Sequence, residues 1–110
     1  MGSPTFINAL TASNSATLSF TSGLDSTYYQ YMFVCNDIHP ETDGASFSFQ
    51  CSTDGGSNYN TTTTNSTFRA YHFEDGSGGV LAYDGSTDQH QGTAFQWLAE
   101  NFGADNDQRS

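Results

Sequence analysis

Positively charged residues are almost missing from this sequence of 110 residues. It contains no lysine and two arginines, Arg69 and Arg109, against twelve aspartate and glutamate residues, which gives a formal net charge of −10. Binding to nucleic acid or to an anionic membrane surface depends on lysine and arginine, so we expect neither as a partner. The acidity suits solubility, because like charges keep proteins apart, and it equally suits a salty environment that screens self-repulsion.

Long hydrophobic runs are missing as well. The longest apolar run, Tyr31–Cys35, is far short of the roughly 20 residues that a transmembrane helix needs. The first residues, Met1–Pro4, have neither the positive charge nor the apolar stretch of a signal peptide. We therefore expect a soluble chain that does not insert into membranes and carries no mark for secretion.

Histidines are too dispersed for a zinc site. His39, His72 and His90 lie far apart in the sequence, whereas zinc ligands cluster at short spacings. Two acidic loops, Asp75–Gly79 and Asp105–Asp107, carry oxygen ligands of the kind that calcium prefers, but they match no EF-hand or β-roll series. We interpret both loops as turns and expect no metal and no cofactor.

Cysteine is also scarce, with Cys35 and Cys51 as the two examples. Both fall in strand-like stretches on the side of the aromatic residues, and the first interpretation is two small buried hydrophobic side chains. The alternative is a cross-strand disulfide. A hairpin made of residues 28–37 and 45–52, centred near Asp43, would bring the two cysteines nearly opposite each other.

Aromatic residues supply most of the material for a core. Nine Phe, six Tyr and one Trp stand among many Ser, Thr, Asn, Asp and Gly residues, while aliphatic residues are scarce. Ser, Asn and Asp compete with the helical backbone for hydrogen bonds, so the composition favours strands and turns. A chain of this length forms at most one domain, and we assign residues 1–110 to a single domain that can bury a core.

Alternation of apolar and polar residues predicts the strands. Phe47, Phe49 and Cys51 share the dry face of a strand over residues 45–52, and Asp54–Gly56 supplies the positive-φ positions of a tight hairpin turn. Tyr28–Asp37 is the strongest strand, because apolar residues on both of its faces are typical of a covered central strand. We also predict strands at 16–21, 67–74 and 80–83, a turn at 75–79, an edge strand or loop at 59–66 and a polar loop at 84–91.

One stretch departs from this pattern. Within residues 93–102, Phe95, Leu98 and Phe102 stand at i, i+3 and i+7, with Thr93 as a possible N-cap and Gly103 as a C-cap glycine. This spacing predicts one short helix near the C-terminus. Short strands separated by glycine turns predict an antiparallel sandwich or barrel. We predict a mainly β fold, an antiparallel β-sandwich of jelly-roll-like type with that helix packed on it.

No pattern typical of catalysis is found. Glu74 ends an aromatic strand, but glycoside hydrolysis needs a facing pair of carboxylates, and the twelve acids single out none. His72 lies between Tyr71 and Phe73 and is interpreted as a half-buried structural residue. A Gly-x-Ser-x-Gly elbow is missing, and the turn Asp54–Ser57 lacks the lysine and helix of a phosphate loop. We predict no catalytic residues and no enzyme activity.

Amphipathic aromatic side chains leave a binding function open. Exposed rings stack on sugars, while nearby carboxylates and amides hydrogen-bond the hydroxyl groups. The alternative is that most rings belong to the core or to an interface, because the chain has little else from which to build one. No ligand-binding residue can be singled out among the candidates Tyr28, Tyr29, Tyr31, Tyr59, Tyr71, Tyr83 and Trp97.

Four segments together resemble a known family. They are Ser19–Tyr28, Phe33–Asp43, Phe49–Asn60 with its motif Ser-Thr-Asp-Gly-Gly-Ser-Asn-Tyr, and Phe68–Asp75. The chain resembles the front part of a family encoded by marine tailed bacteriophages, of generally unassigned role and regarded as virion components of tail-fibre or surface type. The resemblance brings no catalytic residues with it.

Members of that family continue past the point that matches residues 105–108, so the resemblance implies a fragment, a processed form or a short variant, each of which lacks the later strands of the domain. Unpaired sheet edges associate readily, which favours a homo-oligomer over a free monomer. The resemblance implies a phage virion structural protein, a tail fibre or a capsid or tail decoration, made in the bacterial host cytoplasm and located in the virion. It would assemble with other virion proteins and contact a host-surface glycan. The alternatives are a carbohydrate-binding β-sandwich module and, third, a glycan depolymerase.

Overall fold

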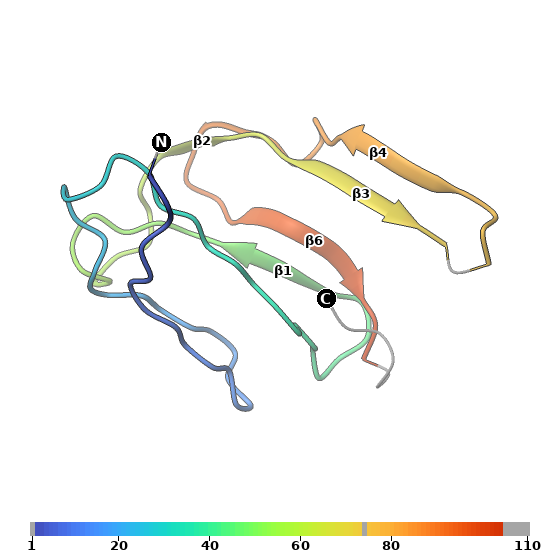
Figure 1. Ribbon diagram of the computed structural model, residues 1–110, viewed down its shortest axis with the longest axis horizontal. Coiled ribbons are helices and arrows are strands. Elements are labelled where there is room, and N and C mark those ends of the chain that lie inside the picture. Colours follow the sequence, from blue (N-terminus) through green and yellow to red (C-terminus); the bar gives the residue numbers. More distant parts are fainter. Residues whose placement is uncertain (1, 74, 105–110) are drawn as a thin grey trace.

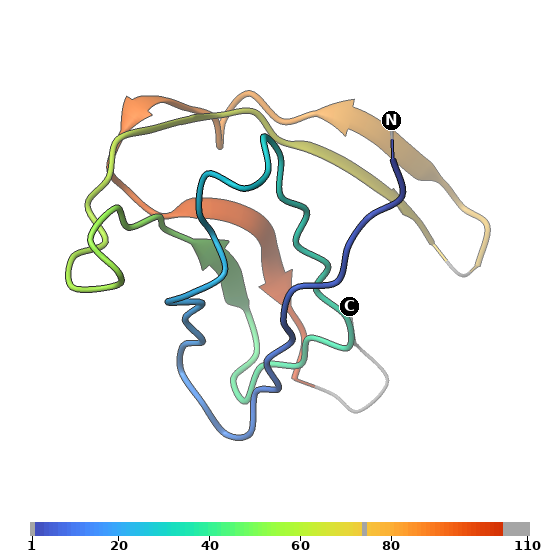
Figure 2. The same ribbon diagram turned by 60° about the vertical axis from the view of Figure 1, so that its left-hand side comes forward.

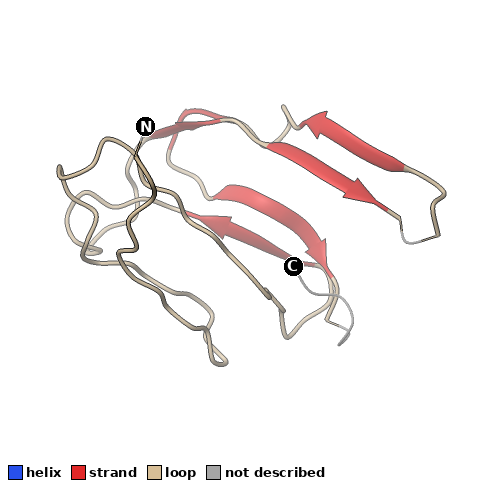
Figure 3. Ribbon diagram, viewed as in Figure 1, coloured by secondary structure: helices blue, strands red, loops and turns tan. Residues whose placement is uncertain are grey.

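The computed structural model describes residues 2–73 and 75–104, and the fold is mainly β (Figure 1). Its strands pair two by two into three antiparallel sheets: β1 (Ala45–Phe49) with β6 (Gln96–Phe102), β2 (Thr63–Asn65) with β5 (Gln89–Gly92), and β3 (Phe68–His72) with β4 (Gly79–Tyr83). No helix occurs in the described residues (Figure 3). The mainly β class and the antiparallel pairing are confirmed, whereas a closed jelly-roll sandwich stays a prediction.

The β1–β6 pair carries the least exposed face of the molecule. Residues that lie opposite each other in an antiparallel pair project to the same side of the sheet. The phenylalanines of β1 therefore share a face with their partners on β6, and all the side chains of this face are half-buried or buried. The facing residues are Ala45 and Phe102, Phe47 and Ala99, and Phe49 and Gln96. The dry face predicted for Phe47 and Phe49 is confirmed, but β1 ends at Phe49, so the predicted extension of this strand to residue 52, with Cys51 on the same face, is wrong.

The helix predicted over residues 93–102 is wrong, because Gln96–Phe102 forms strand β6. The register with β1 shifts twice: β6 advances three residues against two and then two residues against one. Each shift is a β-bulge that adds one residue to β6, and Asn101 in this region has a positive φ of 56°. The bulges stretch the spacing of residues on one face from two to three. The face that meets the phenylalanines of β1 therefore holds Gln96, Ala99 and Phe102, and it does not include Phe95 and Leu98, on which the helix was predicted.

The β3–β4 hairpin is regular. Five consecutive pairs run from Phe68 opposite Tyr83 to His72 opposite Gly79. The turn between the strands is closed by the Phe73 amide, which donates to the Gly78 carbonyl over 2.9 Å. The predicted strands at 67–74 and 80–83 and the turn at 75–79 are confirmed in their described residues.

The short β2–β5 pair tests the predictions made for residues 59–66 and 84–91. Residues 63–65, within the stretch predicted as an edge strand or a loop, form strand β2. Their partner β5 lies largely inside residues 84–91, which were predicted as a polar loop, so that prediction is wrong in part. The Gln91 amide also donates to the Thr64 hydroxyl over 3.1 Å, so a polar side chain supports this pair.

The first part of the chain forms no strand in residues 2–44 and lies as loops beside the β1–β6 pair (Figure 2). The strands predicted at 16–21 and 28–37 are therefore wrong for this structure. A central strand needs hydrogen-bonding partners on both edges, and no described segment pairs with residues 28–37. Local contacts hold these loops instead, including the edge-to-face rings of Phe20 and Phe33, 5.6 Å apart.

A buried hydrophobic core is missing from the described residues. Gln96, with 2% of its surface exposed, is their one buried side chain, and it is polar. The radius of gyration is 15.8 Å, against about 13 Å for a compact domain of this length. The core predicted behind the aromatic residues therefore amounts to a half-buried face, and the chain is more open than a self-sufficient domain.

Candidate functional site

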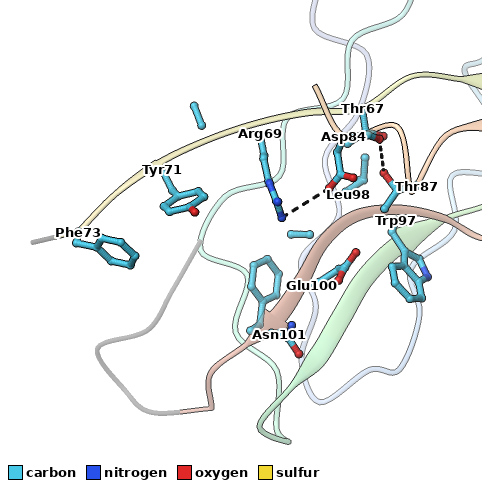
Figure 4. Close-up of a pocket in the computed structure, with 13 residues that line it drawn as sticks. Thr67, Arg69, Tyr71, Phe73, Asp84, Thr87, Trp97, Leu98, Glu100 and Asn101 are labelled. Carbon is cyan, nitrogen blue, oxygen red and sulfur yellow. Dashed lines mark hydrogen bonds and ion pairs between the residues drawn. The ribbon is translucent and has the colours of Figure 1, made fainter. Parts of the chain in front are cut away.

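A groove lies between the β3–β4 hairpin and strand β6 on the described surface (Figure 4). Its volume is about 750 Å³. Apolar and aromatic side chains supply most of its wall, and charged or polar groups stand among them. The lining residues are Thr67, Arg69, Ala70, Tyr71, Phe73, Asp84, Thr87, and Trp97 to Phe102.

One wall of the groove is built by alternation along β3. Arg69, Tyr71 and Phe73 project from the same side of the chain toward β6, as Figure 4 shows. The Tyr71 and Phe73 rings meet edge to face with centroids 5.6 Å apart, which fixes their orientation. The alternation within residues 67–74 of the sequence predicts that these three residues share one face, and the structure confirms it.

The opposite wall is a continuous stretch of β6. Six consecutive residues, Trp97 to Phe102, line the groove. A regular strand presents only every second residue to one side, so the two bulges account for this continuous lining. Trp97 and Leu98 are about half exposed, with 44% and 46% of their surfaces accessible.

An ion pair crosses the base of the β3–β4 hairpin. The Arg69 guanidinium lies 3.7 Å from the Asp84 carboxylate, with 61% and 15% of the two side chains exposed. The pKa of Asp84 is lowered first by the hydrogen bond from the Ser86 hydroxyl and then by the Arg69 charge. An exposed pair of this kind adds little to stability, and it instead places one cation and one anion beside the aromatic wall.

Gln96 anchors the inner end of β6. Its Nε2 donates to the Thr67 hydroxyl over 2.8 Å, and to the carbonyls of Thr87 and Trp97 over 3.0 Å each. Its buried Oε1 has no hydrogen-bond partner. One amide therefore ties β6 to the start of β3 and to the loop before β5, the two segments that continue into the groove wall.

A second set of polar contacts joins the connection between β4 and β5 to Thr67. The Tyr83 hydroxyl donates to the Asp88 carboxylate, and the same carboxylate accepts from the Thr67 amide over 3.2 Å. The Asp84 amide donates to the Thr67 carbonyl over 2.8 Å. These bonds hold the β4–β5 connection against the start of β3.

The tight turn predicted at Asp54–Gly56 is confirmed within a polar loop over residues 52–58, but the strands on its two sides, β1 and β2, do not pair, so the hairpin expected there is wrong. The Asp54 carboxylate accepts from the Ser52 hydroxyl over 2.6 Å, and from the Asn58 amide and side chain over 2.9 and 2.8 Å. These bonds, the Ser52 hydroxyl first, lower the pKa of Asp54 to about 2. Gly55 and Gly56 have φ angles of 71° and 91°. The carboxylate is fully used in closing the turn.

The candidate chemical residues are not brought together. His72 is exposed on β3, so its interpretation as half-buried is wrong, and its Nδ1 lies 3.4 Å from the Phe73 carbonyl. Glu74 and residues 105–107 lie outside the described residues. Asp75 accepts from the Ser77 amide over 2.8 Å, as expected of a turn residue. Throughout residues 2–73 and 75–104, no three acidic, histidine or cysteine side chains are placed to hold a metal ion.

The aromatic candidates are scattered over the molecule. Only Tyr71 and Trp97 line the groove. Tyr28 and Tyr31 meet edge to face at 5.9 Å, and the Tyr31 hydroxyl donates to the Asp25 carbonyl over 2.7 Å. The remaining three stand apart: Tyr29 is fully exposed, Tyr59 packs on Gly56, and Tyr83 bonds Asp88.

The two cysteines are free. Cys35 is exposed and Cys51 is half-buried, so neither is the buried hydrophobic side chain that the first interpretation expected. The hairpin on which the disulfide alternative was based does not form, because residues 28–37 are not a strand. The Cys35–Cys51 bond stays a prediction without its supporting geometry.

Sequence reasoning missed the residues that shape this site most strongly. Gln96 and the β6 wall lay inside the predicted helix. The bulges of β6 depend on its pairing with β1, so the sequence of β6 alone does not indicate them. The alternation of Arg69, Tyr71 and Phe73 was visible in the sequence.

No helix in the described ranges has the length and hydropathy needed to cross a membrane. Comparisons of the chain with protein-family models, with curated proteins and with solved structures find no match.

Proposed function

We propose that this chain is a structural protein of a phage virion, of tail-fibre or decoration type, that works by assembling with copies of itself and with other virion proteins. The sequence resemblance indicates the virion, and the exposed apolar surface supports the assembly. Its site of action would be the particle, with a host-surface glycan as an outer contact.

One observation supports this proposal most directly: the chain leaves too much surface uncovered. Its accessible surface is 9070 Å², whereas a folded monomer of 11.9 kDa exposes about 6,000 Å². Each partner buries roughly 1,000–2,500 Å² in an obligate interface, so the excess of about 3,000 Å² per chain is enough for more than one such contact. Large apolar side chains contribute to it throughout, among them Phe6, Met32, Phe68 and Leu81, each at least 72% exposed.

The test of assembly is the mass of the purified chain in solution. Size-exclusion chromatography with light scattering, over a range of protein concentrations, should give at least twice the 11.9 kDa of a single chain. A compact single chain at every concentration would contradict the proposal. The virion is tested separately by mass spectrometry of purified particles of the encoding phage. The chain should be present in many copies per particle, and its absence would rule out a virion function.

The groove favours one second candidate, a carbohydrate-binding module. Tyr71 and Trp97 offer ring faces in the same groove as the Arg69–Asp84 pair, and sugars need both kinds of group. A glycan array would show binding that Tyr71→Ala weakens at least tenfold, while Tyr29→Ala, outside the groove, leaves it unchanged. Equal binding by both variants would exclude the groove as the glycan site.

A further inference from the structure

The segment Tyr28–Asn36 has no strand partner among the described residues. It forms no strand, and no backbone–backbone hydrogen bond joins it to any described residue. Its apolar side chains are nevertheless large and accessible: Tyr29 is fully exposed, and Met32, Phe33 and Val34 are 56–72% exposed. Apolar residues on both faces are typical of a strand with neighbours on both sides. The segment therefore has the properties of a strand whose neighbours are outside the chain.

The groove between β3 and β6 has exposed apolar side chains that no part of the described chain covers. Its side chains Tyr71, Phe73 and Leu98 are 46–54% exposed, although they line a hollow of about 750 Å³. Both bordering strands have an unpaired edge in the described structure, because each sheet contains two strands. Unpaired edges beside exposed apolar side chains are a template for an added segment.

We propose that Tyr28–Asn36 of one chain occupies the β3–β6 groove of a second copy, so that copies assemble by exchanging this segment. This inference rests on the proposed assembly function and names the surfaces that carry it. A chain that gives one segment and receives another makes two contacts. Dividing the excess of about 3,000 Å² between two contacts buries about 1,500 Å² of each chain in each contact, which is within the range of obligate interfaces.

Charge is compatible with the entry of this segment into the groove. Two chains with a net charge of −10 repel each other. Tyr28–Asn36 contains no acidic residue, so it adds no negative charge beside Asp84 and Glu100. Residues 1–24 also contain none, but Tyr28–Asn36 differs from them in its three consecutive exposed apolar side chains, Met32 to Val34.

A matched set of charged variants tests this contact. Val34→Asp in the segment and Leu98→Asp in the groove should each reduce the mass in light scattering to that of one chain. Leu10→Asp, at a residue with similar exposure (40% against 46% for Leu98), should leave the assembly intact. If the wild-type chain assembles and both Val34→Asp and Leu98→Asp still assemble, the exchange is wrong while the assembly function stands. If the wild-type protein is a single chain, both the exchange and the proposed assembly function are wrong.

Rescue separates a broken contact from a misfolded chain. A mixture of Val34→Asp chains with Leu98→Arg chains forms one contact with opposite charges and one with native residues. It should therefore regain the assembled mass, and failure to regain it would overturn the exchange.

Cross-linking identifies the segment directly. In a Cys51→Ser, Ala99→Cys chain, mild oxidation should join Cys35 of one copy to the introduced thiol of another and give covalent dimers. A bond within single chains would instead place the segment in its own groove and overturn the exchange. Glycan binding that Tyr71→Ala abolishes in the assembled protein would do the same, because the groove would then be open.

Discussion

Gln96 gives the sharpest test of how this fold is held, because it is the one buried side chain among the described residues. We expect Gln96→Ala to lower the free energy of unfolding by about 2–3 kcal/mol. Its Nε2 has two hydrogens and three acceptors within 3.0 Å, so about two full hydrogen bonds are lost. Each is worth about 1 kcal/mol, and leaving the Thr87 and Trp97 carbonyls unpaired adds to the cost.

Two further substitutions at this position separate the effect of the lost hydrogen bonds from the effects of side-chain volume and of the unpaired Oε1. Gln96→Leu also loses the donors, but it fills the volume and removes the Oε1 atom that has no partner, so it should cost about 1 kcal/mol less than Gln96→Ala. Gln96→Glu replaces the Nε2 donor with a carboxylate oxygen, which would face the Thr67 hydroxyl and the carbonyls of Thr87 and Trp97. A buried carboxyl in that position would be favoured in its protonated form, so this variant should be weakest at neutral pH and recover as pH falls toward 4.

The measurement is urea unfolding followed by fluorescence. Trp97, the one tryptophan of the chain, is adjacent to the substitution. All proteins are compared at one fixed concentration, because assembly adds a concentration-dependent term. Gln91→Ala is the matched control: its side chain is exposed, and surface substitutions usually stay within about 0.5 kcal/mol. A Gln96→Ala protein as stable as Gln91→Ala would refute the view that this amide joins β6 to the rest of the fold.

Two predictions concern the polar turn. Hydrogen bonds from Ser52 and its neighbours lower the pKa of Asp54 from 3.8 to about 2, so its stabilising contribution is complete above about pH 4 and is lost as pH falls through 2. A carboxyl NMR titration should show this low pKa, and Asp54→Asn should reduce the loss of stability at acid pH, to which the lowered pKa values of Asp25, Asp75 and Asp84 also contribute; a titration near 3.8 would contradict the prediction. Gly56→Ala should cost about 1–2 kcal/mol or more, because φ is 91° and the new Cβ would lie 2.9 Å from the Tyr59 hydroxyl. Gly55→Ala, with φ of 71° and open space around its Cβ, should cost less, and a reversed order in urea unfolding would contradict the contact.

Local features of the fold could be predicted because the residues that determine them are close in sequence. The β3–β4 hairpin depends on alternation within each strand and on a glycine turn between them, and both are visible in residues 67–83. The same holds for the Asp54 turn, whose hydrogen bonds span no more than four residues. One wall of the groove, with Arg69, Tyr71 and Phe73, followed from the same alternation.

The other wall could not be predicted from its own residues. The two bulges of β6 exist because β1, far away in the sequence, pairs with it in a shifted register. Each bulge changes which residues share a face, so the pattern along β6 records its partner as much as its own preference. Gln96 illustrates the difficulty, since a glutamine is seldom fully buried. It became the buried anchor because Thr67 and Thr87 are brought to it by tertiary structure.

The failure of the strand at residues 28–37 and the missing core have one physical cause. A strand with apolar residues on both faces is stable only when each face is covered and each edge is paired, which a sheet of two strands cannot provide. The described chain forms three such sheets, so its strongest strand sequence finds no place among them. Exposing Tyr29, Met32 and Val34 forgoes hydrophobic stabilisation of roughly 1.5–3 kcal/mol for each fully buried side chain. That loss is recovered only if another surface covers them, and a second copy of the same chain offers a groove with the same unmet requirement.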